Sequence, residues 1–269
     1  GIYIGTNENG ILASTITNPS AFEFIMPDGP IRNNIFRVRK APSTLWALYG
    51  SYSRLYNPYN PPFGLGTFPI SSYKPETGWD IIPYSNLFGA KSLSNITFNP
   101  NNEKNFFVSS YFSGLLKVEN EVPTQLFDSS NTGTSGLETL VLAGNPTYGP
   151  DVRINGPVYD KNGNLWMTNS FVTKGLKVLR SNGQWQSYDL SDVIPEADLE
   201  SYGLLVVDRN GTKWMPTFRN GLVAFNENLN NKSIVIKDGS NGNLPSTDVR
   251  CVAIDNKNQL WIGTGRGLR

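Results

Sequence analysis

The residues best suited to contact another molecule are clustered between positions 49 and 59. Four tyrosines, Tyr49, Tyr52, Tyr56 and Tyr59, lie there together with Arg54. Tyrosine presents a rigid ring with a polar tip and arginine adds a planar cation, a combination typical of protein interfaces and of sugar-binding surfaces. The segment could instead pack on its own sheet, and the sequence favours neither interpretation.

The residue types of most catalytic machinery are absent or dispersed. The 269 residues include no histidine, which excludes imidazole bases, the usual nucleophilic triads and histidine metal ligands. The carboxylates are scattered through expected turns. No two of them are indicated by the sequence as a pair at the separation that a glycosidase needs. They include Asp160, Asp208, Asp238, Asp255 and a local cluster at Glu196 and Glu200 expected in a solvated loop or short helical turn. We predict a binding or scaffolding module, not an enzyme, with no catalytic residue and no cofactor.

Composition narrows the class of protein further. The 23 basic and 22 acidic residues give a net charge of +1 without a basic stripe, which argues against a nucleic-acid partner. No apolar run approaches the roughly 18 residues of a membrane span. The single Cys251 allows no disulfide within the chain and is predicted to be a small buried hydrophobic residue. Abundant glycine and proline indicate an all-β chain with many turns.

A pattern of strand, glycine and second strand recurs six times in the sequence. These strands are the elements expected to position the tyrosine cluster. An aromatic residue marks each copy: Tyr3, Trp46, Phe107, Trp166, Trp214 and Trp261. The copies are about 40–60 residues apart, near the period of a β-propeller blade. A four-stranded blade buries its faces only against neighbouring blades. We predict one propeller domain over residues 1–269, whose first copy lacks the inner strand and whose last copy lacks the outer strand.

A short turn precedes the aromatic strand in the better-preserved copies, at residues 160–163, 208–211 and 255–258. Its aspartate accepts hydrogen bonds from the following backbone, and its glycine or asparagine takes the left-handed conformation of a tight hairpin. These turns lack the later acidic ligands of a calcium loop, so we predict no metal. The tryptophans are expected to pack between blades, with Trp46, Trp166, Trp214 and Trp261 largely buried.

Two copies carry insertions, at about residues 51–72 and 129–150. Insertions in propellers project from one face, and long ordered loops on a rigid scaffold often carry function. The tyrosine cluster falls at the first insertion. We therefore expect the segment from Tyr49 to Tyr59 to lie on one rim of the ring.

The segment from Asp238 to Thr264 resembles the two-component regulator propeller repeat. That repeat consists of a Gly-Leu-Pro turn, a Val-Arg strand, an Asp turn and a Leu-Trp-Ile-Gly-Thr strand, and here it reads Asn-Leu-Pro, Val-Arg-Cys-Val, Asp255 and Leu-Trp-Ile-Gly-Thr. Residues 163–176 and 208–222 fit well. Other copies depart from the pattern, because Phe107 replaces the tryptophan and Pro216 interrupts the fifth copy.

Residues 45–52, 109–115 and 165–170 are similar to a narrower group, the PorZ-like proteins of the Bacteroidetes type IX secretion system. This resemblance implies an exported protein at the cell surface, in the outer membrane or in the periplasm, with a sorting domain beyond this chain. The implied partners are PorU-, PorV- and PorQ-like proteins and anionic lipopolysaccharide or another glycan. The resemblance supplies no catalytic residues.

Two other functions remain open on the sequence. The first is the extracytoplasmic propeller of a hybrid two-component sensor that recognises oligosaccharides, although the two insertions count against its regular blades. The second is a lyase of the propeller class, which the missing histidines make the weakest of the three.

Overall fold

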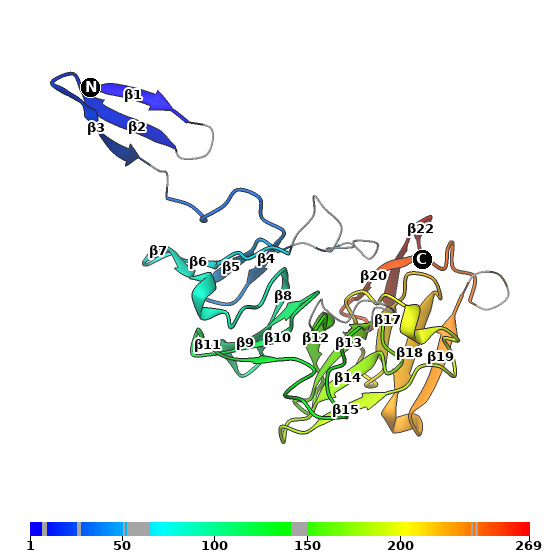
Figure 1. Ribbon diagram of the computed structural model, residues 1–269. Coiled ribbons are helices and arrows are strands. Elements are labelled where there is room, and N and C mark those ends of the chain that lie inside the picture. Colours follow the sequence, from blue (N-terminus) through cyan, green and yellow to red (C-terminus); the bar gives the residue numbers. More distant parts are fainter. Residues whose placement is uncertain are drawn as a thin grey trace, which may run out of the picture.

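The computed structural model describes residues 1–6, 10–25, 28–50, 52, 65–140, 150–237, 239 and 242–269. In these residues the chain forms six antiparallel sheets, four with four strands and two with three (Figure 1). Consecutive strands pair in every sheet, as in a propeller blade. Short 3-10 turns lie between some strands: η1 (Tyr84–Asn86), η3 (Ala197–Leu199) and η4 (Glu227–Leu229). The predicted all-β fold with six repeat copies is confirmed.

The first three sheets occupy the N-terminal half of the chain. Sheet 1 contains β1 (Ile2–Gly5), β2 (Ile11–Thr15) and β3 (Asn18–Ile25). Sheet 2 contains β4 (Arg37–Lys40), β5 (Leu45–Leu48), β6 (Ile70–Lys74) and β7 (Gly78–Ile82). Sheet 3 contains β8 (Leu93–Asn99), β9 (Asn102–Ser110), β10 (Gly114–Glu119) and β11 (Val122–Phe127).

The other three sheets follow in the same strand order. Sheet 4 contains β12 (Arg153–Tyr159), β13 (Leu165–Ser170), β14 (Leu176–Leu179) and β15 (Trp185–Tyr188). Sheet 5 contains β16 (Val206–Val207), β17 (Lys213–Pro216), β18 (Leu222–Asn226) and β19 (Lys232–Ile236). Sheet 6 contains β20 (Val249–Ile254), β21 (Leu260–Thr264) and β22 (Gly267–Leu268). Sheets 1 and 6 have three strands each, and the other four sheets have four.

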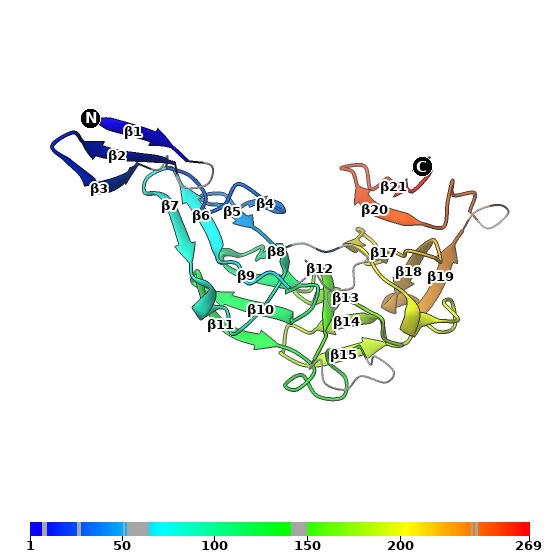
Figure 2. The ribbon, with the colours of Figure 1, turned by 45° about the horizontal axis from the view of Figure 1, so that its top comes forward.

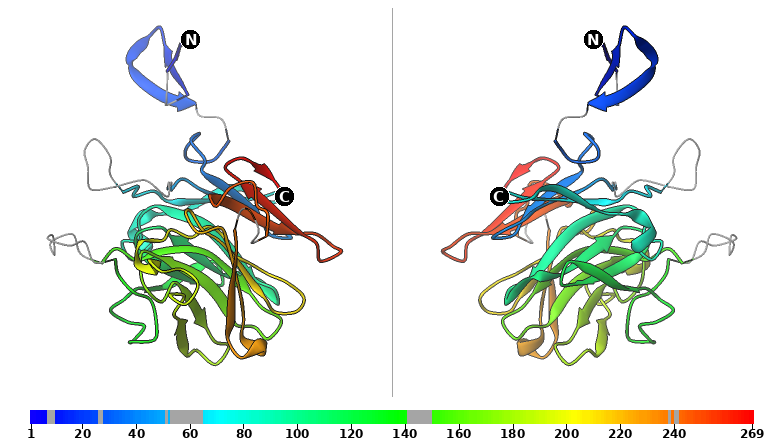
Figure 3. Two further views of the ribbon diagram at one scale, coloured as in Figure 1. Left: turned by 90° about the vertical axis from the view of Figure 1, so that its right-hand side faces the viewer. Right: turned by 90° about the vertical axis from the view of Figure 1, so that its left-hand side faces the viewer.

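Sheets 2 to 6 follow one another in an arc (Figure 2). Their first strands, β4, β8, β12, β16 and β20, each contact the next and so line the inside of the arc. Sheet 1 is set apart from these five sheets and stands above them in both views of Figure 3. Its Tyr3 ring is 69% exposed.

Strand direction assigns every connection to one of two rims. Because neighbouring strands are antiparallel, the turns between first and second strands all lie at one edge of the sheets, which we call the lower rim. The connections between second and third strands, and those from one sheet to the next, lie at the opposite edge, the upper rim. Both insertions belong to connections of the upper rim.

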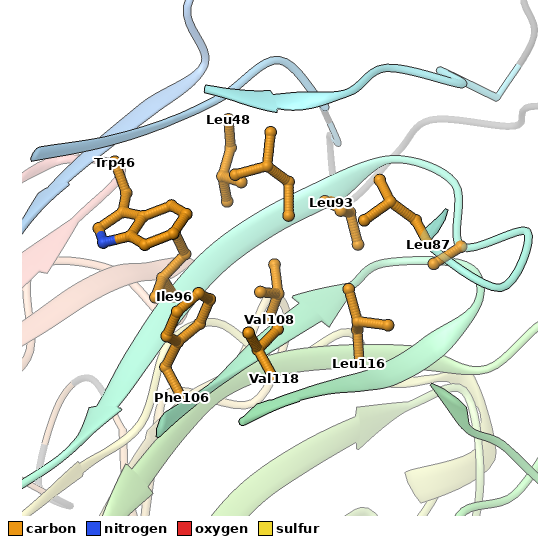
Figure 4. Close-up of a cluster of buried hydrophobic side chains, with 11 residues drawn as sticks. Trp46, Leu48, Leu87, Leu93, Ile96, Phe106, Val108, Leu116 and Val118 are labelled. Atoms are coloured by element: carbon orange, nitrogen blue, oxygen red, sulfur yellow. The ribbon is translucent and has the colours of Figure 1, made fainter. Parts of the chain in front are cut away.

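In the arc, a sheet covers the aromatic residue of the sheet before it. The Trp46 ring on β5 lies 4.7 Å from the ring of Phe106 on β9, and the two share a cluster with Leu48, Leu93 and Val108 (Figure 4). Likewise, Trp166 on β13 lies 6.0 Å from Phe225 on β18 in the next sheet. Trp46 and Trp166 are 2% and 0% exposed, so their predicted burial is confirmed.

Burial of the aromatic positions declines toward the last sheet. Trp214 is half-buried beneath the three-stranded sheet 6, and Trp261 is 47% exposed because no sheet of the described chain packs on its face. The predicted burial of Trp261 is therefore wrong. The predicted burial of Cys251 is also wrong: Cys251 is exposed and pairs with Gly263, on the same uncovered face as Trp261.

The turn before β13 also holds the indole of that strand. Oδ1 of Asp160 accepts backbone hydrogen bonds from Asn162 and Asn164 at 2.9 Å, as predicted. Oδ2 of Asp160 accepts from Nε1 of Trp166 at 2.9 Å. Gly163 completes the turn with a φ of 77°, the left-handed conformation that glycine adopts without strain.

The same hydrogen bond from indole to aspartate recurs in sheets 5 and 6. Nε1 of Trp214 donates to Asp208 at 3.1 Å, and Nε1 of Trp261 donates to Asp255 at 3.3 Å. Both carboxylate oxygens of each aspartate therefore accept hydrogen bonds from N–H groups of its own hairpin. We call this arrangement the Asp–Trp latch.

The latch makes stability depend on pH. Burial alone would raise the pKa of Asp160, but the hydrogen bonds from Asn164 and Trp166 outweigh it and hold the pKa below its ordinary value. The stabilisation is complete above the unfolded pKa, about 3.9, and is lost as the pH falls through the lower folded pKa. We expect Asp160→Asn to lower the free energy of unfolding by about 1–2 kcal/mol near neutral pH and by progressively less below about pH 4.

Urea denaturation across this pH range measures the difference. Asp192→Asn is the control, because Asp192 is exposed and its substitution is expected to change stability by less than about 0.5 kcal/mol. A difference between the wild type and Asp160→Asn that does not vary with pH would contradict the latch.

Candidate functional site

Three aromatic residues from separate connections meet on the upper rim. The ring of Tyr52 stacks on that of Tyr111 at 4.3 Å between centroids, with 21° between the planes. Phe36 meets Tyr52 edge to face at 5.7 Å. Tyr111 is fully buried, whereas Tyr52 is half-buried and Phe36 is 36% exposed. Tyr111 is therefore the floor of this aromatic cluster, and Tyr52 and Phe36 are its accessible part.

Hydrogen bonding fixes the floor in place. The hydroxyl of Tyr111 lies 2.6 Å from Oγ of Ser201, on the connection from sheet 4 to sheet 5. Burial raises the pKa of Tyr111, so the hydroxyl stays protonated at neutral pH. Stacking on a buried, hydrogen-bonded ring orients Tyr52 at little further entropic cost.

A buried arginine fixes the same rim between sheets 3 and 4. Arg153 is 5% exposed, and its Nε and Nη2 each donate to the carboxylate of Asp151 at 2.9 Å. The guanidinium carbon lies 5.0 Å from the ring centroid of Phe112 and 4.9 Å from that of Phe171. The bidentate pair and the rings compensate the cost of burying this charge.

The second insertion is attached to sheet 4. The carboxylate of Glu138 pairs with the ammonium of Lys177, whose side chain is fully buried. Burial lowers the pKa of Lys177, and Glu138 acts in the opposite direction. The backbone N–H of Glu138 donates to Asn169 at 2.8 Å, and Leu137 is buried beside it. Leu137 and Glu138 therefore attach this insertion to the rim, while 141–149 lie outside the described residues.

Glu200 organises a third part of the rim. It is 1% exposed, and its carboxylate accepts from the backbone of Ser201 and Phe218 at 2.9 and 2.8 Å and from Nδ2 of Asn220 at 2.5 Å. The predicted short helical turn is present, but the expected solvated position is wrong for Glu200. Its backbone partners come from a distant connection that the sequence around it does not reveal.

A cavity of about 290 Å³ opens where the described parts of the two insertions approach. Leu65 and Pro150, the first described residues after each undescribed stretch, both line it. Phe112 and Val152 form part of its wall, and Lys91 and Asp128 add a cation and a carboxylate. The upper rim thus combines exposed rings, charge and a hollow.

The predicted binding residues have different positions in the structure. Tyr49 is 5% exposed and its hydroxyl donates to Oγ of Ser71 at 2.6 Å, so it supports the rim from below. Tyr52 belongs to the aromatic cluster. Arg54, Tyr56 and Tyr59 lie outside the described residues, and their position on the rim remains a prediction.

Sequence reasoning missed Phe36, Tyr111 and Arg153. A signal for Arg153 was present, because Asp151-Val152-Arg153 repeats the Asp248-Val249-Arg250 of the last copy. In that copy Nε of Arg250 also donates to the carboxylate two residues earlier, at 3.0 Å. Phe36 and Tyr111 carry no comparable pattern.

The last repeat of the chain matches a known family model. Residues 243–266 match the family model described as the two component regulator propeller. The resemblance predicted for the last copy is thereby confirmed. No curated protein matches the chain in sequence.

Solved structures show the same propeller fold. PorZ, a bacterial surface component of the type IX secretion system of Porphyromonas gingivalis, is 19% identical with a TM-score of 0.74, over 99% of this chain and 36% of PorZ. The extracellular domain of a hybrid two component system from B. thetaiotaomicron is 17% identical with a TM-score of 0.63, over 99% of this chain and 30% of that one. An ancestral GH74 enzyme is 13% identical with a TM-score of 0.55, over 99% and 42%.

The chain spans about a third of the length of PorZ and of the sensor domain. At identities this low, the similarity concerns the fold alone. The similarity in fold to PorZ agrees with the resemblance expected from the sequence. In the described part of the chain, no helix is both long and apolar enough to cross a membrane.

The two Asp-Val-Arg sequences provide a matched test of the rim. Arg153→Ala leaves Asp151 buried without its guanidinium partner, so we expect the free energy of unfolding to fall by about 3–5 kcal/mol. Arg250→Ala breaks the corresponding pair where the arginine side chain is 64% exposed, and is expected to cost at most about 1 kcal/mol. Guanidinium denaturation compares the variants, and equal losses would contradict the assigned role of Arg153.

Proposed function

We propose that the chain is a non-enzymatic binding module of an exported surface protein resembling PorZ, which takes part in type IX secretion and cell-surface attachment. The observation that carries this proposal is the aromatic cluster of Phe36, Tyr52 and Tyr111 beside two insertions on one rim. Its outer rings are accessible and its floor is held rigidly. Rigid aromatic residues on a fixed scaffold bind other molecules with a small loss of conformational entropy.

The proposed ligands are PorU-, PorV- and PorQ-like partner proteins and anionic lipopolysaccharide. Aromatic rings suit either a protein surface or the apolar face of a sugar. Arg37 is adjacent to Phe36, and the same strand carries two further cations, Arg39 and Lys40, toward the lower rim. Among the described residues no carboxylate pairs with these three cations, and Nε of Arg37 is buried without a hydrogen-bond partner.

The electrostatics of this strand favour an anionic ligand. Partial burial lowers the pKa of Arg39, and the neighbouring charge of Arg37 lowers it further. Two uncompensated like charges held on one strand repel each other, and a bound anion relieves that repulsion. A polyanionic glycan supplies such charges together with sugar rings.

A binding role also fits the carboxylates of the described chain. Asp160, Asp208 and Asp255 hold the latches, Asp151 pairs with Arg153, and Glu200 accepts from four N–H groups of the rim. A glycosidase needs two carboxylates free to exchange protons with substrate. These five acids already have structural partners, so none of them is free for that role.

The alternative function is that of a sensor propeller that recognises oligosaccharides. Its support is the structural similarity to the extracellular domain of a hybrid two component system. A neutral oligosaccharide would bind with little dependence on salt, whereas an anionic glycan held by Arg37 and its neighbours would be released by salt. Binding at low and high ionic strength therefore separates the two functions.

Combined substitution of Tyr52, Arg54 and Tyr56 by alanine tests the rim. We expect at least about a tenfold loss of affinity for immobilised anionic lipopolysaccharide and for partners captured from outer-membrane extract, since interface aromatics and arginines carry much of the binding energy. The thermal unfolding temperature should stay close to that of the wild type. Lys161→Ala, an exposed change on the lower rim, is the control and should bind normally. Undiminished binding by the triple variant would refute the proposed site.

A further inference from the structure

The tryptophan of sheet 2 lacks the latch that holds the tryptophans of sheets 4, 5 and 6. Ala41 follows β4 as Asp160 follows β12, and the backbone N–H of each donates to the carbonyl that closes its turn, at 2.8 and 2.9 Å. Because alanine has no carboxylate, Nε1 of Trp46 is without an acceptor among the described residues. Figure 4 shows this nitrogen at the edge of the apolar cluster, directed away from the aliphatic side chains.

Trp46 is the first of three residues with hydrogen-bonding side chains in one row across sheet 2. Trp46 pairs with Ser72 on β6, and Ser72 pairs with Asp80 on β7, so the three side chains lie on the same face. Ser72 is only 8% exposed, and its hydroxyl has no hydrogen-bond partner in the described part of the chain. In sheets 4 and 5 the middle residue of this row is apolar, Val178 or Ala224.

A cavity of about 340 Å³ opens beside this row, between sheets 2 and 3. Trp46, Ser72 and Asp80 line it, and sheet 3 contributes Glu121 and the start of β11. Neither Nε1 of Trp46 nor Oγ of Ser72 is fully enclosed, so each can bond to a molecule in this space. Because third and fourth strands form its walls, we call this cavity the outer pocket.

Between sheets 4 and 5, a hydroxyl group occupies the corresponding position. Arg180 pairs with Glu227 at 3.1 Å, and the hydroxyl of Tyr188 accepts from Arg180 at 2.7 Å and donates to Glu227 at 3.5 Å. In sheet 2, Lys74 corresponds to Arg180 and pairs with Glu121 of sheet 3 at 2.5 Å. The chain itself thus shows how a hydroxyl binds at such an ion pair.

The charges around the outer pocket disfavour an anionic ligand. Lys74 is neutralised by Glu121, and Asp80 forms no ion pair within the described residues. The charged residues of the lining therefore leave one uncompensated negative charge, which repels an anion. Val122 and Pro123 add an apolar wall from sheet 3. A neutral molecule with both hydroxyl groups and apolar surface fits this lining best.

We propose that the outer pocket binds one neutral pyranose unit of a sugar. A pyranose combines hydroxyl groups, which donate and accept, with apolar C–H faces. One hydroxyl accepts from Nε1 of Trp46 and bonds to Ser72, and a neighbouring hydroxyl donates to Asp80. The volume is near the lower end of the roughly 300–1,000 Å³ of small-molecule sites, which suits a single unit. This site is separate from the upper rim and does not depend on the function proposed there.

Titration with the methyl α-pyranosides of glucose, mannose and galactose tests the proposal. In two-dimensional NMR the indole N–H resonance of Trp46, assigned by Trp46→Phe, should shift with at least one of them, while that of Trp261 stays in place. Cyclohexanol has a ring of similar size with a single hydroxyl and should bind at least about tenfold more weakly. No shift of the Trp46 resonance up to the solubility of the glycosides, or equal binding of cyclohexanol, would overturn the assignment.

Two substitutions of Ser72 separate the role of the hydroxyl from that of the space. Ser72→Ala removes the hydroxyl and should weaken binding of the glycoside about fivefold, the loss expected for one hydrogen bond. Ser72→Val introduces the residue of sheet 4 at this position and should abolish binding, because it also fills part of the pocket. Ser233→Val, on the outer strand of sheet 5, is the matched control and should bind normally. Full binding by a Ser72→Val variant that keeps the wild-type thermal unfolding temperature would refute the site.

The source of the sugar unit is decided by a disaccharide. Maltose, mannobiose and lactose carry glucose, mannose and galactose at the non-reducing end, so the one that matches the bound glycoside is titrated in the same way. Binding at least as tight as that of the glycoside indicates the end of a glycan chain. Binding of the glycoside alone indicates a free monosaccharide, and binding of neither contradicts the proposal.

Discussion

The structure depends on the covering of one sheet's aromatic residue by the next sheet. A single blade cannot bury both of its faces, so its large apolar side chains gain their stabilisation, about 1.5–3 kcal/mol each, only from a neighbour. Trp46 and Trp166 have four-stranded neighbours and are buried, Trp214 has a three-stranded neighbour, and no sheet of the described residues covers Trp261. The Asp–Trp latch also fixes the orientation of the indole of Trp166, Trp214 and Trp261.

This stacking order determines where other molecules can bind. The backbone groups of the strands bond to one another within each sheet. Residues that bind other molecules are therefore expected in the connections at the rims. On the upper rim the connections are cross-linked by buried polar groups such as the Arg153–Asp151 pair and the Glu200 carboxylate. Tyr52 stands on that fixed base. Exposed rings on a rigid support suit recognition of a surface.

Periodicity made the fold predictable, because strands, tight turns and the six copies are encoded locally. Contacts between sheets were harder to predict. Burial of Trp261 and Cys251 was wrongly expected because alternation within a strand shows which face a side chain takes, not whether another sheet covers it. Tyr111 and Ser201 are 90 residues apart, and no local pattern links them. The sequence grouped Tyr49 and Tyr52 because they are close in the chain. In the structure Tyr49 is buried, whereas Tyr52 is half-buried in the aromatic cluster.

Hydrogen exchange of the indole N–H groups tests the central claim most directly. If each latch is protected by the following sheet, the Nε1 proton of Trp166 must exchange far more slowly than that of Trp261, with Trp214 between them. Two-dimensional NMR in deuterated water, with each indole assigned by single Trp→Phe substitution, measures the three rates. The account predicts that order. Equal rates for Trp166 and Trp261 would show that the sheets do not cover one another in sequence, and would contradict it.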